Sequence, residues 1–378
     1  MHLLILGACV RAAAHSALRA GFQPIGLDLF VDRDLIAVGP ARRLPPDGFP
    51  LGFADLAAEV PLCPWIYTGG LENHPDLIDR IAASRPLWGN AATTLRAVRD
   101  PLQVADVLAR AGLPHPEVRS SPAGLPRDGT WLIKPRASAG GRGIRPLLVE
   151  ERDPPQDVYF QKRLEGPVGS GLFLGERTGA RLLGVTQQLH GPRGTKEEFL
   201  YRGSIGPWPV APATRDTLEQ IGHLVGREFG LVGLFGIDFV LQGVTPWPLE
   251  INPRYTASIE TLELALGRSL LIEHVRGCAP EVLGRISPRR AHPRSRPLVV
   301  GKEILYATRS GRFPETVRGS FDPARPFAVP LLADLPEAGM PFGSGEPLAS
   351  VFALGPTFEV CRARLRVVAR HWRERLGG

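Results

Sequence analysis

The sequence predicts a multidomain chain that combines α/β and α+β architecture, and three observations carry this prediction. The 378 residues exceed what one compact core holds and suffice for two or three domains. The first hundred residues alternate short apolar runs with helical patterns, which favours a mostly parallel sheet flanked by helices. After Pro101 the pattern changes to short strands separated by glycines and prolines, which is typical of antiparallel sheet.

Within the first domain, expected over residues 1–98, an apolar run at 3–6 leads through an Ala-rich helix to a second run that ends at Asp28. This order indicates a strand, a turn, a helix and a strand. Further strand or helix candidates follow at residues 64–68, 75–83 and 91–97.

A second domain is expected over residues 99–280. Its candidate strands are 130–135, 158–164, 171–175, 181–188 and 234–241. A helix is predicted over 214–229 with Thr214 as its N-cap. Residues 281–297, rich in Arg, Pro and Ser, predict a linker or loop. The last module, 298–378, should contain a strand at 298–306 and an amphipathic helix at 357–374.

Composition excludes several classes of protein. The hydrophobic share of 43% and the charged share of 22% are those of a globular chain. The net charge of +7 comes from Arg residues spread along the whole sequence, so we expect no nucleic-acid partner. No run of 18 apolar residues occurs, so we expect no membrane partner. Four widely spaced cysteines predict neither a disulfide framework nor a zinc site, and they fit a cytoplasmic location.

A glycine-rich loop follows a strand that ends in Lys134. Its glycines, Gly140, Gly141 and Gly143, can turn successive backbone N–H groups toward a phosphate. The alternative is an ordinary hairpin turn, and the loop is no Walker motif because no Gly-Lys-Ser/Thr follows. Only four of the 45 basic residues are Lys, at positions 134, 162, 196 and 302. A scarce ammonium beside such a loop favours a phosphate contact.

Residues 234–252 predict a hairpin that brings three oxygen-bearing side chains together. Asp238 lies on its first strand, while Glu250 and Asn252, two residues apart, share one face of the second. Magnesium prefers such ligands and completes its shell with water and phosphate. The alternative is a polar outer face, which fits poorly in strands this apolar. Arg254 either stabilises charge on a reacting group or makes a surface salt bridge.

Five motifs in this order resemble the ATP-grasp superfamily. They are Ile133-Lys134-Pro135, the loop 138–144, the segment 161–166, Gly236-Ile-Asp238-Phe, and Leu249-Glu250-Ile-Asn252-Pro253-Arg254. The resemblance covers about 99–280 and implies an ATP-grasp domain of two α+β subdomains. It also implies a Rossmann-like parallel N-terminal domain that binds substrate and a small C-terminal module.

The resemblance further implies a role for each matching residue. Lys134 would hold phosphates and join Arg254 in catalysis, and the loop residues Ser138, Gly140, Gly141 and Gly143 would cover the phosphates. The hinge residues Gln161, Lys162 and Leu164 would contact adenine, while Asp238, Glu250 and Asn252 would bind Mg²⁺, with Mn²⁺ as an alternative ion. Many members carry another Lys where this chain reads Val98-Arg99-Asp100-Pro101. Arg99 or Arg96 would replace it.

The N-terminal residues 7–16 and 28–32 are also similar to a branch described as predicted ATP-dependent carboligases, which resemble carboxylate–amine ligases. This similarity implies that ATP activates a carboxylate as an acyl phosphate, which an amine then attacks, in cofactor biosynthesis. Candidate substrate contacts are Arg11, Ser16, Glu72 and Asn73. A solvated helix face is the alternative for the first two residues and a helix N-terminal loop for the last two. Residues 186–188 and 196–204 are further candidates for the acceptor pocket.

Other activities remain open at this point. A kinase that makes a stable phosphate ester, a nucleotide-binding protein without catalysis and a bicarbonate-using carboxylase all fit the same motifs. The partners expected are a small carboxylate and a small amine, and the sequence leaves a homodimer open.

Overall fold

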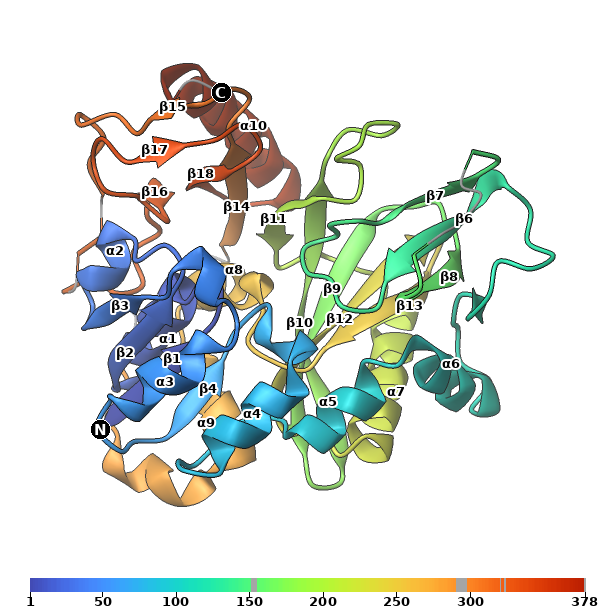
Figure 1. Cartoon of the computed structure of the whole chain (residues 1–378), viewed down its shortest axis with the longest axis horizontal. Coiled ribbons are helices and arrows are strands. Elements are labelled where there is room, and N and C mark those ends of the chain that lie inside the picture. The colour runs from blue at the N-terminus through green and yellow to red at the C-terminus, as the bar shows by residue number, and fades with distance from the viewer. Residues whose placement is uncertain (151–154, 290–297, 320, 323, 377–378) are drawn as a thin grey trace.

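The computed structural model describes residues 1–150, 155–289, 298–319, 321–322 and 324–376. A parallel α/β unit comes first, a small antiparallel sheet follows, and a large antiparallel sheet fills the rest (Figure 1). None of the described helices has both the length and the apolar character needed to cross a lipid bilayer.

The N-terminal residues form a four-stranded parallel sheet in the order β3-β2-β1-β4. Its strands are β1 (His2–Leu6), β2 (Gln23–Asp28), β3 (Ala41–Arg43) and β4 (Trp65–Tyr67). Its helices are α1 (Arg11–Ala20), α2 (Arg33–Ile36), η1 (Pro46–Gly48), α3 (Gly52–Ala58), η2 (Leu71–Asn73), α4 (Pro75–Ala82) and α5 (Ala92–Val98). Residues 3–6 are fully buried, as expected of a central parallel strand covered on both faces. The predicted strand, turn, helix and strand over residues 3–28 are confirmed.

A second, smaller sheet has the order β5-β8-β6-β7 and is antiparallel. It follows helix α6 (Pro101–Arg110) and contains β5 (Val118–Arg119), β6 (Asp128–Pro135), β7 (Arg145–Leu148) and β8 (Val158–Lys162). Trp131, Ile133 and Phe160 pack together in its core. These side chains leave the face that carries Lys134 free to line a pocket.

The largest sheet has eight strands in the order β13-β12-β9-β10-β11-β14-β18-β16, all antiparallel. Its strands are β9 (Val168–Glu176), β10 (Gly179–His190), β11 (Tyr201–Gly206), β12 (Gly233–Gln242), β13 (Thr245–Asn252), β14 (Val299–Tyr306), β16 (Leu332–Ala333) and β18 (Pro347–Gly355). The accompanying elements are α7 (Pro212–Glu228), α8 (Ala257–Leu266), α9 (Leu271–Cys278), η3 (Pro280–Arg285), α10 (Phe358–Leu376) and the pair β15 (Gly311–Arg312) and β17 (Pro341–Phe342).

Helix α7 covers one face of this sheet and shows where a local sequence signal misleads. Its buried side chains, Leu218, Ile221 and Val225, share a core with Phe173 and other strand residues. The prediction that Thr214 caps this helix is wrong, because the helix begins at Pro212 after Ala211. Thr214 lies in the first turn and donates its hydroxyl to the Val244 carbonyl 2.7 Å away. It therefore ties the helix to the β12–β13 turn.

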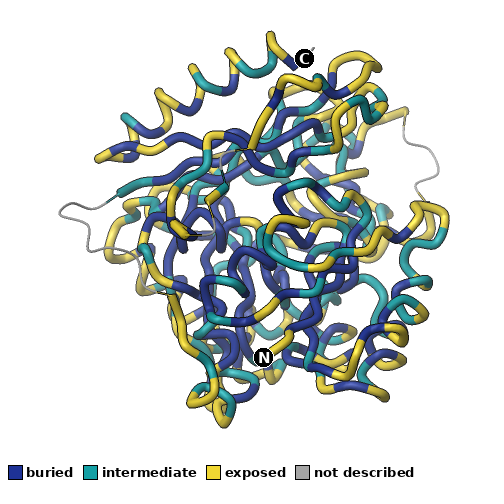
Figure 2. Tube along the Cα trace, turned by 90° about the vertical axis from the view of Figure 1, so that its left-hand side faces the viewer, coloured by how far each residue is buried: buried dark blue, intermediate teal, exposed yellow. Residues whose placement is uncertain are grey.

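The C-terminal strands extend the central sheet, since β14 pairs with β11 on one side and with β18 on the other. Helix α10 packs on these strands through Phe358, Cys361, Leu365 and Ala369. Exposed residues of the helix lie between these four along the chain. Figure 2 shows this alternation of buried and exposed residues along the helix that runs to the C-terminus. Of the segment 281–297, expected to be a linker or loop, residues 290–297 lie outside the described residues.

Candidate functional site

Two carboxylates face each other across the β12–β13 hairpin. The register of these strands pairs Asp238 with Glu250 and Gly236 with Asn252. The Asn252 amide donates to Asp238 Oδ2 at 3.1 Å and to Glu250 Oε1 at 3.4 Å, and Gln188 on β10 donates to Asp238 Oδ1 at 2.8 Å. The hairpin therefore gathers the three expected oxygen-bearing side chains at one point.

The two carboxylates of this pair have different electrostatic surroundings. Burial, together with the Glu250 charge, raises the pKa of Asp238 to about 7. Burial would also raise the pKa of Glu250, but Arg99 and Lys134 lower it below its ordinary value. The surroundings thus favour the anionic form of Glu250 and the protonated form of Asp238, as in other close carboxylate pairs. A divalent cation would ionise both carboxylates, and their hard oxygen atoms suit magnesium.

Lys134 on β6 lies opposite this pair. Its side chain is 5% exposed and its ammonium donates to Gln161 Oε1 at 3.1 Å. The Gln161 amide in turn donates to the Leu249 carbonyl on β13 at 3.3 Å. Gln161 thereby links the small sheet to the large one and holds the ammonium at their junction.

A cavity of about 430 Å³ lies between the two sheets. Its lining includes Lys134, Gly140, Gly141, Gln161, Lys162, Leu164, Asp238, Glu250, Asn252 and Arg254. Gln188 and Tyr201, from the two segments proposed for an acceptor pocket, also line it. Most of the expected ATP and metal residues therefore share one cavity.

Two expected loop residues lie elsewhere. Ser138 lines a smaller adjoining cavity of about 50 Å³ together with Arg99, and Gly143 packs on Pro135. Within the same loop, Gly141 has a φ of 77°, and an added Cβ would lie 1.8 Å from the Phe199 carbonyl oxygen. Only glycine fits this contact, which rests the loop against the segment that connects β10 and β11.

Arg254 is fixed in place by the N-terminal domain. Its Nε donates to Glu72 Oε1 at 2.8 Å, and one terminal nitrogen lies 3.2 Å from Asn252 Oδ1. Glu72 is 2% exposed, and Arg254 binds one of its carboxylate oxygens, while the other, Oε2, has no hydrogen-bond partner among the described residues. Asn73 donates to the Ser138 carbonyl at 3.2 Å. Both residues, expected as substrate contacts, connect the first domain to the site.

The structure distinguishes between the two arginines considered near Pro101. Arg99 is mostly buried, lies 3.8 Å from Glu250 Oε2 and donates to Asn73 Oδ1 at 3.0 Å. Arg96 forms a surface ion pair with Asp76 instead. Only Arg99 is therefore placed to act at this site.

Arg11 and Ser16 are buried at the junction of α1 and α8. Arg11 binds both carboxylate oxygens of Glu260, and Ser16 donates to Glu263 Oε1 at 2.6 Å. Neither side chain lies on a solvated helix face, because both are at most 1% exposed. Their contacts hold the first domain to the central sheet.

Sequence reasoning missed Lys302, whose ammonium lies 3.0 Å from Glu260 Oε2 and 3.1 Å from Asp334 Oδ2. Its rarity as one of four lysines was the available signal. Asp334 gave no signal, because it lies in an irregular segment just beyond β16.

Comparisons with known proteins identify the domain to which these residues belong. The family model of the ATP-grasp domain matches residues 98–258. The carbamoyl phosphate synthase large chain of Myxococcus xanthus is 24% identical over 213 residues, which are 49% of this chain and 19% of that protein. The chain spans less than two fifths of the length of the curated relatives it matches.

Solved structures show the same fold across nearly the whole chain. The biotin carboxylase domain of 2-oxoglutarate carboxylase from Hydrogenobacter thermophilus has a TM-score of 0.72 and 18% identity, covering 97% of this chain and 89% of that one. Phosphoribosylamine–glycine ligase from Thermotoga maritima has a TM-score of 0.67 and 16% identity, covering 98% and 96%. The resemblance drawn from the sequence motifs is thus confirmed at the level of fold.

Proposed function

We propose that this chain, which carries an ATP-grasp domain at residues 98–258, is an ATP- and Mg²⁺-dependent ligase that joins a small carboxylate to an amine. The observation that carries the proposal is the single cavity in which Asp238, Glu250 and Asn252 face the ammonium of Lys134. The structural neighbours add support, since the Thermotoga maritima protein is a phosphoribosylamine–glycine ligase.

In this proposal the carboxylate substrate attacks the γ-phosphorus of ATP, ADP leaves, and an acyl phosphate forms. The amine nitrogen then attacks the acyl carbon and inorganic phosphate leaves. Asp238, Glu250 and the Asn252 amide oxygen hold Mg²⁺, which neutralises charge on the phosphate oxygens when bound. Such chemistry needs positioned charges rather than a protein nucleophile.

The remaining residues position the substrates and protect the intermediate. Lys134 and Arg99 bind phosphate oxygens of ATP, and the Gln161–Leu164 segment contacts the adenine. Arg254, oriented by Glu72, stabilises negative charge that develops at the acyl carbon. The 138–144 loop covers the phosphates and excludes water, which would otherwise hydrolyse the acyl phosphate.

The alternatives are a nucleotide-binding protein without catalysis and a kinase. The three side chains proposed to bind the metal lie together, and Arg99 brings a positive charge to within 3.8 Å of Glu250, which supports a functional site over a degenerate one. A kinase would retain the transferred phosphoryl group in its product, whereas the ligase releases it as free phosphate.

The test is a screen of carboxylate and amine pairs for ADP formation and phosphate release. We expect equal amounts of ADP and phosphate, formed only when both substrates are present. Glu250→Gln should reduce this turnover at least about 10³-fold, because it removes a charged metal ligand. Glu219→Gln, on the exposed face of α7, is the matched control and should keep full activity. Undiminished turnover by Glu250→Gln would refute the metal assignment, and ADP formed without phosphate would identify a kinase.

A further inference from the structure

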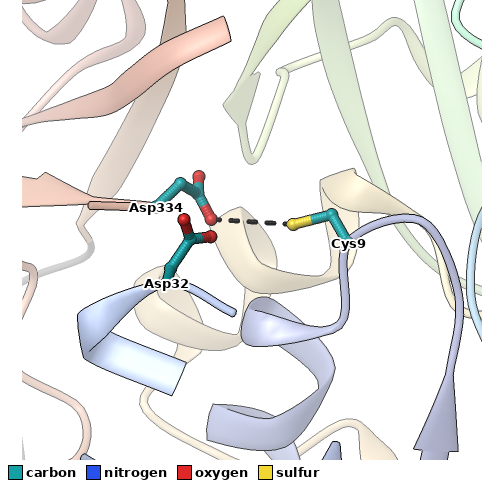
Figure 3. Close-up of side chains that lie close together, drawn as sticks. All are labelled: Cys9, Asp32 and Asp334. Carbon is teal, nitrogen blue, oxygen red and sulfur yellow. Dashed lines mark hydrogen bonds between the residues drawn. The ribbon is translucent and has the colours of Figure 1, made fainter. Parts of the chain in front are cut away.

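A second group of potential ligands lies outside the cavity described above, where three segments of the chain meet. Cys9 follows β1, Asp32 precedes α2, and Asp334 follows β16 (Figure 3). One ligand atom from each residue lies within 4.8 Å of the other two. The Cys9 sulfur lies 3.9 Å from Asp334 Oδ1, and the Asp32 carboxylate points toward the same space in Figure 3.

Asp32 is the unusual member of this group. Its side chain is 4% exposed, yet no hydrogen bond or ion pair to its carboxylate occurs among the residues that the structure describes. Three further carboxylates, those of Asp334, Asp34 and Asp28, lie near it. A buried carboxylate in such surroundings is costly unless a cation binds it.

The neighbouring carboxylates already have partners. Asp28 accepts backbone N–H groups at the start of α1 and in its own turn, and Asp34 accepts those of Asp334 and Leu335. Asp334 receives Arg11 Nε at 2.8 Å, Lys302 Nζ at 3.1 Å and the Ser350 hydroxyl. Such contacts to a carboxylate are those that orient a metal ligand from outside the coordination shell.

We propose that Cys9, Asp32 and Asp334 bind a divalent cation of the zinc class at this junction. A hard ion such as magnesium would not recruit a thiol, whereas zinc accepts sulfur and carboxylate oxygen together. Zinc bond lengths of about 2.3 Å to sulfur and about 2.1 Å to oxygen place tetrahedral ligands roughly 3.6 Å apart. The observed sulfur-to-oxygen distance of 3.9 Å needs only a small adjustment to reach that value.

Binding forms a bond from the Cys9 sulfur to the metal and releases the thiol proton to solvent. Because Cys9 is exposed, the fourth coordination position faces solvent and takes a water molecule. Two of the three ligands belong to the N-terminal sheet and one to the C-terminal strands, so the ion also cross-links these parts. Two non-glycine residues with positive φ in the described chain, Val31 at 54° and Asp334 at 55°, lie at this junction. Strained backbone of this kind often accompanies ligand sites.

The test is titration of the chelator-treated full-length protein with Co²⁺, followed through the near-ultraviolet band of a cobalt–thiolate bond. We expect one such band per chain, displaced by one equivalent of Zn²⁺. Cys9→Ser should abolish the band, and Asp32→Asn should weaken the affinity at least about 100-fold. Cys278→Ser, which removes another partly exposed thiol, is the matched control and should leave the band unchanged.

Thermal unfolding separates loss of binding from loss of fold. Zn²⁺ should raise the Tm of the wild-type protein. Asp32→Asn should raise the Tm of the metal-free protein, because it removes a buried unpaired charge, and Zn²⁺ should then have no further effect.

A missing cobalt band, a band that survives Cys9→Ser, or a Zn²⁺-dependent rise in Tm that survives Asp32→Asn would each overturn the metal site. An absent band combined with a raised KM for an amine substrate in Asp32→Asn would overturn it too, and would assign the carboxylates to a substrate ammonium group.

Discussion

Two pairs of acidic residues in this molecule have opposite surroundings, one pair buried at a junction and the other partly exposed in the cavity. Glu260 and Glu263 on α8 are fully buried and fully paired, the first with Arg11 and Lys302 and the second with Arg19, Ser16 and backbone N–H groups. Asp238 and Glu250 on the β12–β13 hairpin lie beside each other with too little positive charge around them. The first pair holds two parts of the fold together, and the second leaves its charge for a ligand to balance.

The pKa values express the same difference. Burial alone would raise the pKa of Glu260, but Arg11 and Lys302 bring it down to about 2. Burial and the adjacent Glu250 raise that of Asp238 to about 7. The surroundings therefore favour the ionised form of Glu260 and the protonated form of Asp238, because Glu260 has two bound cationic partners and Asp238 has an acidic neighbour.

The largest expected effect on stability comes from a substitution at Glu260, in the fully paired region. Glu260→Gln removes one of the two anions that Arg11 and Lys302 share and leaves Asp334 as the other, so we expect a loss of about 3 kcal/mol in the free energy of unfolding, measured in urea. The wild-type protein should also lose stability as the pH falls from about 4.5 to about 2, because the folded state must then bind a proton it resists. A change below 1 kcal/mol would show that this network does not hold the parts together.

A smaller change in stability, of opposite sign, is expected for a substitution at Asp238 in the β12–β13 hairpin. Since the folded state raises the pKa of Asp238, the ligand-free protein should lose stability as the pH rises from about 4 to about 7. Asp238→Asn should remove this dependence and increase stability near pH 7 by on the order of 1 kcal/mol, a value reduced by solvent screening.

Mg²⁺–ADP binding to the wild-type protein should strengthen through the same pH range, because Asp238 must lose its proton to bind the ion, whereas Arg99 and Lys134 already favour the ionised form of Glu250. Calorimetric titration at several pH values checks this expectation. Affinity independent of pH, or a destabilised Asp238→Asn variant, would contradict the contrast between the two regions.

A third comparison concerns the two arginines near Pro101. Arg96→Ala removes an exposed ion pair with Asp76, so both stability and nucleotide affinity should change by less than about 1 kcal/mol. Arg99→Ala should weaken ATP binding about tenfold, because it removes a positive charge beside Glu250. Equal nucleotide affinities for the two variants, measured by calorimetry, would show that Arg99 has no special role.

The sequence predicted the hairpin well because its information is local. Alternation along two strands places Glu250 and Asn252 on one face, and a short turn brings Asp238 beside them. The run of glycines in the 138–144 loop also predicted a tight turn. In the structure Gly141 has a positive φ and lies against a backbone carbonyl. Strand alternation and turn glycines therefore identified Lys134, Asp238, Glu250 and Asn252, whereas Gln161, Lys162 and Leu164 were predicted from the resemblance to the ATP-grasp superfamily.

The contacts between distant segments could not be read in this way. Arg11 meets Glu260 across 249 residues, and Asp34 meets the Asp334 backbone across 300, so no spacing rule links them. Glu72 looked like a substrate contact because it follows a strand end, yet a buried arginine binds it. The cysteine spacing predicted no zinc site, because the two carboxylates near Cys9 come from other parts of the chain.

The most direct measurement is a crystal structure of the protein soaked with Mn²⁺ and a non-hydrolysable ATP analogue, with the ion located from its anomalous signal. We expect the Mn²⁺ peak within about 2.3 Å of oxygen atoms from Asp238, Glu250 and Asn252, with the Lys134 ammonium on the phosphates of the same nucleotide. A metal peak away from these three side chains, or a nucleotide bound outside the cavity between the two sheets, would contradict the account.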